Sequence, residues 1–96
     1  MILTITLLLC ISLLVVDWLQ TRFIADHPER FTESNLILGE HPSLRAVDIY
    51  FACCVAATMV LAWLLPYWWA IGAGVALAAL EAFVTVRNYR HGIRIW

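Results

Sequence analysis

Charged residues are missing from two long stretches of this chain, and their absence constrains the fold more than any motif does. Residues 1–16 contain no charged side chain, and neither do residues 49–80, where the mostly apolar run is broken by Pro66. The second stretch is too long for one buried helix of a soluble protein and is typical of two membrane crossings joined by a tight turn. The sequence therefore predicts a chain embedded in a bilayer.

The overall composition also argues against a soluble domain. The chain has 96 residues, of which 64% are hydrophobic and 14% charged, whereas so small a soluble fold needs a larger polar surface. Its formal net charge is −1, and no basic run is present that would follow a phosphate backbone. We therefore expect membrane lipid around the chain and no nucleic acid as a partner.

The apolar runs and turn residues predict an all-α protein, a bundle of three transmembrane helices that forms a single domain over residues 1–96. The helices are expected at about residues 2–24, 44–65 and 67–89, with residues 25–43 as the cytoplasmic connection. Ser43 suits the N-cap of the second helix, and Pro66 belongs to the turn before the third. At ~1.5 Å per residue, each helix comes near the ~30 Å thickness of the hydrocarbon core.

The basic residues, which are all arginines, predict how this bundle is oriented. Three crossings place the connection and the C-terminus on one side of the membrane, and the N-terminus and the Pro66 turn on the other. The arginines on or beside the first side are Arg22, Arg30, Arg45, Arg87, Arg90 and Arg94. Because basic residues gather on the cytoplasmic side, we expect a multi-pass protein with its N-terminus outside and its C-terminus in the cytoplasm.

Small residues recur at intervals of four positions on the second and third predicted helices. These pairs are Ala52 and Ala56, Ala70 and Gly74, Gly72 and Ala76, and Ala78 and Ala82. Such spacing lets helix backbones approach closely, although alanine-rich membrane helices also produce it by chance. The pattern indicates where helices can meet.

Each predicted helix brings one acidic residue toward the cytoplasmic boundary. These residues are Asp17, Asp48 and Glu81. Because ionisable groups at membrane depth are costly and usually face protein or water, their similar depth predicts one shared polar site. The alternative is that the acids pair with arginines and anchor the helix ends. The arginines available for such pairs are Arg22, Arg45 and Arg87.

Other residues with chemical potential give weaker signals. The acids of the connection, with His27 and His41, are possible ligands of a divalent metal ion, but no His-x-x-x-His or Cys-x-x-Cys spacing accompanies them. Ser12 has no basic or histidine partner within two helical turns that would activate it as a nucleophile. We therefore expect no metal site and no cofactor, and the sequence favours a non-catalytic protein over an enzyme.

Several polar positions resemble a family of small uncharacterised bacterial inner-membrane proteins. The matching residues are Asp17-x-x-x-Thr21, Glu33-x-Asn35, Gly39-x-x-Pro42-Ser43 and Asn88. The chain differs from the family at Leu36, where members often have proline, and at Arg87, where they often have histidine. The resemblance implies a bacterial inner membrane and a single polar site, but no particular activity. The site candidates are then Asp17, Thr21, Glu33, Asn35, Asp48, Glu81 and Asn88.

The small-residue faces favour an accessory or assembly subunit of a larger inner-membrane complex. Its partners would be membrane lipid and either other membrane subunits or further copies of the chain. A holin-like, pore-forming phage protein is an alternative, because three helices, this length and a charged cytoplasmic end suit that role. A small intramembrane enzyme or transporter that uses the acidic site is a further alternative.

Overall fold

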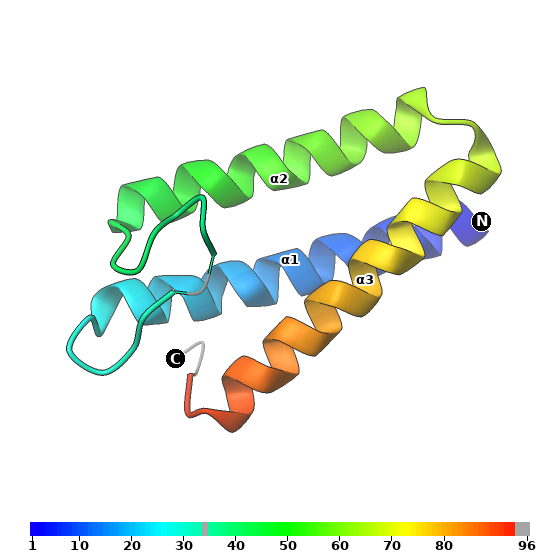
Figure 1. Ribbon diagram of the computed structural model, residues 1–96. Coiled ribbons are helices and arrows are strands. Elements are labelled where there is room, and N and C mark those ends of the chain that lie inside the picture. Colours follow the sequence, from blue (N-terminus) through cyan, green and yellow to red (C-terminus); the bar gives the residue numbers. More distant parts are fainter. Residues whose placement is uncertain (34, 94–96) are drawn as a thin grey trace.

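The computed structural model consists of three helices, and it describes residues 1–33 and 35–93. Helix α1 spans Ile2–Asp26, α2 spans Leu44–Leu64 and α3 spans Tyr67–Arg90, and no strand occurs in the described ranges (Figure 1). All three helices are long and apolar enough to cross a membrane. The all-α fold of three potential transmembrane helices is therefore confirmed, and the observed helix ends lie close to the expected ones.

Local sequence signals explain where α2 and α3 begin and end. The Ser43 hydroxyl oxygen accepts a hydrogen bond from the Ala46 backbone amide at 3.1 Å and so caps the start of α2, as the sequence predicts. Pro66 is the N-cap of α3, where its fixed φ and missing amide proton cost nothing. The α2–α3 turn therefore needs only Leu65 and Pro66.

Helix α1 is the central element of the bundle. It packs against both other helices, whereas α2 and α3 contact each other little. Figure 1 shows the N-terminus near the α2–α3 turn and the connection between α1 and α2 at the opposite end, close to the end of α3. The longest dimension is 44 Å, which matches a bilayer of ~40–45 Å including its headgroup regions.

A compact apolar core joins α1 to α2. Leu14, Val47 and Phe51 are buried there, and the Trp18 ring stacks on Phe51 with 6.0 Å between the ring centroids. Leu38 of the connection packs against the same core. The connection is therefore folded back onto the helices, which allows it to contribute to a site between them.

Small residues bring α1 and α3 together. A Cβ atom added at Gly74 would lie 2.5 Å from Thr6 Cγ2, so only glycine fits this close approach. The fully buried Cys10 thiol donates a hydrogen bond to the Gly74 carbonyl at 3.0 Å. Ala70 and Ala78, one helical turn away on either side, are also buried. The row Ala70–Gly74–Ala78 is thus the face of α3 that packs on α1.

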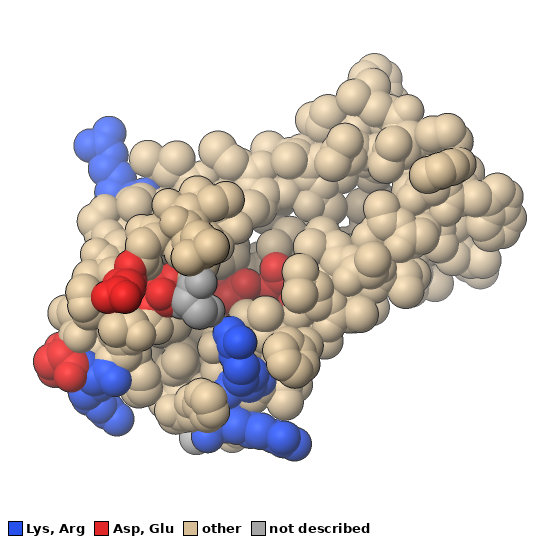
Figure 2. Space-filling view, in the orientation of Figure 1, with Lys and Arg blue, Asp and Glu red and all other residues tan. Residues whose placement is uncertain are grey.

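Charged side chains gather at one end of the bundle. Figure 2 shows arginines and acidic residues at the end that holds the connection, and none on the visible face of the α2–α3 turn. The turn region instead exposes Trp63, Trp68 and Trp69, which suits a membrane interface. Arg94, one of the six arginines in the orientation argument, lies outside the described residues.

Candidate polar site between the helices

A pocket of about 220 Å³ opens between the three helices and the connection, at the charged end of the bundle. We call it the polar pocket. Its polar lining consists of Asp17, Thr21, Glu33, Asn35, Tyr50, Cys54, Glu81 and Arg87. Its apolar lining consists of Leu14, Leu38, Phe51, Leu80 and Val84. Figure 2 shows acidic atoms inside the hollow between the helices.

Most of the site residues expected from the sequence line this pocket. Helix α1 contributes Asp17 and Thr21, the connection contributes Glu33 and Asn35, and α3 contributes Glu81. These residues are distant in sequence, and the fold of the connection over α1 and α3 brings them together. Asp48 and Asn88 are not part of this lining.

Asp17 and Glu81 form the centre of the polar pocket. The Asp17 side chain belongs to the buried set, with 9% exposure, and its carboxyl group is in hydrogen-bonding contact with that of Glu81. Glu81 Oε2 is buried and has no hydrogen-bond partner among the described residues. Two carboxyl groups from different helices therefore meet at a place with little access to bulk water.

Thr21 gives Asp17 only weak support. Its hydroxyl lies 2.8 Å from the Asp17 backbone carbonyl and 3.3 Å from Asp17 Oδ1. A hydroxyl has a single proton to donate, so the two acceptors share it. The Asp17 carboxylate thus receives one long hydrogen bond from Thr21.

The connection adopts a turn that presents its polar side chains to the pocket. Asn35 Oδ1 accepts from the Ile37 amide at 2.9 Å, and the Asn35 amide donates to Glu33 Oε1 at 3.1 Å. Gly39 closes the turn with φ of +83°, a conformation that favours glycine. From α2, the Tyr50 hydroxyl contacts the Asn35 side chain. This turn explains how two residues of a loop become part of a site between helices.

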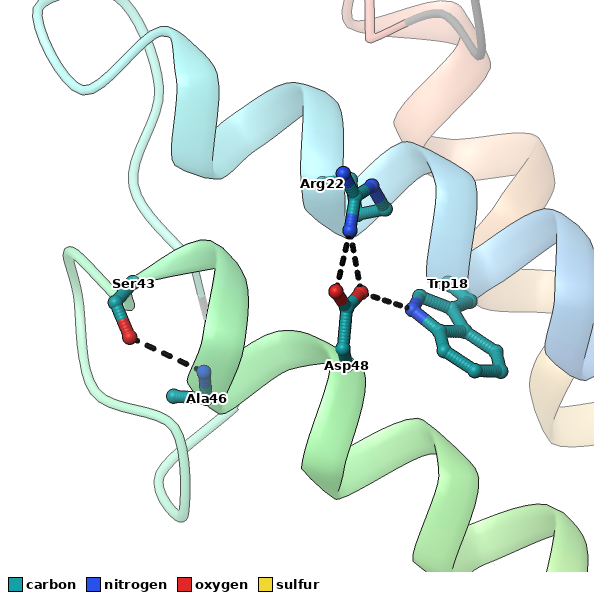
Figure 3. Close-up of polar contacts among 5 residues, drawn as sticks. All are labelled: Trp18, Arg22, Ser43, Ala46 and Asp48. Carbon is teal, nitrogen blue, oxygen red and sulfur yellow. Dashed lines mark hydrogen bonds and ion pairs between the residues drawn. The ribbon is translucent and has the colours of Figure 1, made fainter.

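Asp48 instead forms an ion pair between α1 and α2. Arg22 Nη1 lies 2.5 Å from Asp48 Oδ1 and 2.6 Å from Oδ2, and the Trp18 indole donates to Oδ1 at 2.8 Å. Figure 3 shows both donors converging on this carboxylate. The expected site with all three acids is therefore not what the structure contains. Asp48 follows the alternative, in which an acid pairs with arginine near a helix end.

Asn88 belongs to a separate buried contact between α1 and α3. Its side-chain amide donates to Gln20 Oε1 at 3.1 Å, and the Gln20 amide donates to the Thr85 carbonyl at 3.0 Å. Gln20 is not among the site residues expected from the sequence. The available signal is its position three residues after Asp17, because this spacing places a second polar side chain on nearly the same face of an apolar helix.

The polar pocket has more acidic than basic side chains in its lining. Three carboxyl groups line it, from Asp17, Glu33 and Glu81, with one guanidinium, that of Arg87. Within residues 1–33 and 35–93, no group of three His, Cys, Asp or Glu side chains is close enough to hold a metal ion. Asp17 and Glu81 thus meet without a third ligand of this kind close to them among the described residues.

Comparisons with known proteins add no further assignment, since no family model, curated protein or solved structure matches the chain. The structure itself defines the class: a small protein of three potential transmembrane helices with a carboxyl-rich pocket inside the bundle. Any function must be argued from these features.

Proposed function

We propose that the chain is a non-catalytic accessory or assembly subunit that joins a larger complex of the bacterial inner membrane through α3. The observation that carries this proposal is a second row of small residues on α3. Gly72, Ala76 and Ala79 are exposed, and nothing lies within 4 Å of a Cβ added at Gly72. Since small residues allow close helix packing in lipid, this row suits a transmembrane helix of another subunit.

The hydroxyl groups of the helices support a non-catalytic role. Thr6 donates to the Ile2 carbonyl at 2.8 Å, Ser12 to the Leu8 carbonyl at 2.7 Å and Thr58 to the Cys54 carbonyl at 2.8 Å. Each is a bond within one helix, which satisfies a polar group in an apolar segment. A nucleophile would need a base at this distance instead.

The placement in the membrane follows from the two ends of the bundle. In the proposed orientation, the end with the arginines and the connection faces the cytoplasm, and the tryptophan-rich α2–α3 turn faces outward. A reporter that is active only in the cytoplasm should work when fused after residue 96 and fail when inserted at Pro66. A periplasmic reporter should give the reverse pattern. Cytoplasmic activity at Pro66 would contradict the orientation.

Partner association is tested by Gly72→Leu. Gly72 is exposed and an added Cβ meets nothing within 4 Å, so we expect normal insertion and an unchanged thermal midpoint in detergent. It would hold a partner helix away from α3, and recovery of the partner after native purification should fall about tenfold, the effect of losing ~1.4 kcal/mol of packing. Quantitative mass spectrometry of the purified complex measures this.

The control for this experiment is Val60→Leu on α2, where the side chain is already 52% exposed. It enlarges an exposed apolar side chain by one methylene group away from the α3 row and should leave partner recovery unchanged. Equal recovery with Gly72→Leu and Val60→Leu would contradict the assignment of the α3 face. Large homo-oligomers without a foreign partner, together with lethality on expression, would favour the holin-like alternative instead.

A further inference from the structure

We propose that the polar pocket binds a primary ammonium group, either from a soluble amine or from the headgroup of an aminophospholipid. The site consists of the Asp17 and Glu81 carboxyl groups with the aromatic wall of Tyr50 and Phe51. This inference is independent of the association through Gly72, because it concerns the interior of the bundle and not the outer face of α3.

One buried carboxylate oxygen of the pocket lacks a donor. Glu81 Oε2 is buried without a partner among the described residues, and the Thr21 hydroxyl that lies 3.3 Å from Asp17 Oδ1 also donates to a backbone carbonyl at 2.8 Å. Buried polar atoms in folded proteins nearly always have a hydrogen-bond partner, and exceptions call for an ion, a water or a ligand. The pocket adjoining these oxygens has room for such a group.

The contact between the two carboxyl groups also has a chemical requirement. Asp17 and Glu81 share a proton when they are in hydrogen-bonding contact, because two ionised carboxylates at this distance would repel each other. An ammonium group has three N–H donors and a positive charge, so it replaces the shared proton, which leaves to water, and satisfies both carboxylates through charge-assisted hydrogen bonds. A bare metal ion fits less well, because the described residues offer no cluster of three ligands.

Apolar and aromatic side chains surround the two acids in the pocket lining. Tyr50 and Phe51 meet edge to face with 5.1 Å between their centroids, and Leu14 and Leu80 complete the wall around the acids. Aromatic faces attract ammonium ions, and aliphatic walls accept the attached carbon chain. Binding is therefore expected for an alkylammonium ion rather than for ammonium salts in general.

The test uses the full chain in nanodiscs of phosphatidylcholine and phosphatidylglycerol, which contain no primary amine. Ethylammonium chloride is the probe, and thermal unfolding followed by circular dichroism is the readout. Ligand that binds only the folded state raises the unfolding midpoint. We expect a saturable rise with ethylammonium, and none with sodium chloride or tetramethylammonium chloride at equal ionic strength, since neither cation has an N–H donor.

Substitutions of Asp17 and Glu81 test whether the rise of the unfolding midpoint comes from binding at these acids. Glu81→Gln and Asp17→Asn keep the side-chain shapes, and each should weaken the apparent affinity about tenfold or more, as expected for loss of one charge-assisted hydrogen bond. Glu29→Gln neutralises an exposed acid of the connection and should bind as the wild type does. Helical content and gel filtration confirm that each variant is folded.

Nanodiscs that contain phosphatidylethanolamine distinguish the two sources of the ammonium group. If the lipid headgroup occupies the pocket, these membranes alone raise the midpoint and ethylammonium adds little. If soluble amines are the ligand, membranes with phosphatidylethanolamine leave the unfolding midpoint unchanged, and ethylammonium raises it as before. If ethylammonium did not raise the unfolding midpoint of the wild type, or raised it no more than sodium chloride does, the proposal would be overturned. Asp17 and Glu81 would then be a carboxyl pair that shares a proton. Equal responses in wild type and Glu81→Gln would overturn it as well.

Discussion

Replacing Gly74 by leucine is expected to prevent α1 and α3 from packing and to abolish accumulation of the folded protein. Even the first carbon of a side chain would lie 2.5 Å from Thr6 Cγ2, well inside van der Waals contact. The displaced helix would also lose the hydrogen bond from the Cys10 thiol to the Gly74 carbonyl. Overpacking of this kind costs ~1–3 kcal/mol for small groups and more for a leucine.

A milder pair of substitutions tests the same contact quantitatively. Gly74→Ala should lower the free energy of unfolding by about 1–2 kcal/mol, measured by sodium dodecyl sulfate titration with circular dichroism. Thr6→Ala removes the Cγ2 atom that the new methyl group would meet, so the double variant should regain most of this loss. Non-additivity of this size is the signature of two residues in direct contact.

The matched control is Gly72→Ala, because a Cβ at that position meets nothing within 4 Å. It should leave the unfolding free energy unchanged or slightly raise it, since alanine favours the helix over glycine. If Gly72→Ala and Gly74→Ala had the same effect, helix propensity and not helix contact would explain the result. The proposed close approach of α1 and α3 would then be wrong.

The helices themselves were predictable because their causes are local. Charge-free runs indicate where the chain can cross lipid, and Ser43 and Pro66 mark the ends of helices through capping and a missing amide proton. Helix α1 ends at Asp26, slightly beyond the expected boundary. The difference arises because hydropathy reports the extent of the apolar run, whereas the helix continues through its polar last turns.

The polar pocket was predictable only in part, because rotation of one helix against another is not encoded locally. Spacing along α1 correctly places Asp17 and Thr21 on one face, and both line the pocket. Spacing does not show which side of α1 each of the other two helices packs against. Asp48 has a similar depth but faces Arg22, on a different side of α1 from Glu81.

The separation of Asp48 from the pocket explains why equal depth is a weak predictor of contact. Residues at the same depth on three helices meet only if each helix is rotated so that its residue faces the centre of the bundle. The Gly74 contact sets the rotation of α3, and the core around Phe51 sets that of α2. Both depend on side-chain shape across helices, which a single sequence does not reveal.

The ion pair between Arg22 and Asp48 leads to the second prediction of large effect. Arg22→Leu should lower the free energy of unfolding, because it leaves the Asp48 carboxylate unpaired at a helix position where a lone charge is costly in a membrane. The Trp18 indole, 2.8 Å from Asp48 Oδ1, remains as a donor and limits the loss. Asp48→Leu should cost a similar amount by leaving Arg22 unpaired.

The double variant Arg22→Leu, Asp48→Leu should be more stable than either single variant. The paired side chains are 39% and 42% exposed, beside an apolar groove lined by Val15, Leu19, Ile49 and Ala52. Two leucines would extend this groove and would leave no unpaired charge at these positions, which removes the cost that each single variant carries. Sodium dodecyl sulfate titration of all four proteins gives the coupling energy between the two positions.

Arg90→Leu supplies the control for the change in total charge. Arg90 is exposed in the last turn of α3, so its replacement removes one positive charge without breaking the α1–α2 ion pair. It should leave the unfolding free energy nearly unchanged. If the losses at Arg22 and Asp48 simply added in the double variant, the ion pair would contribute nothing as a pair. Asp48 and Arg22 would then each act through separate contacts between α1 and α2, such as the hydrogen bond from the Trp18 indole to Asp48.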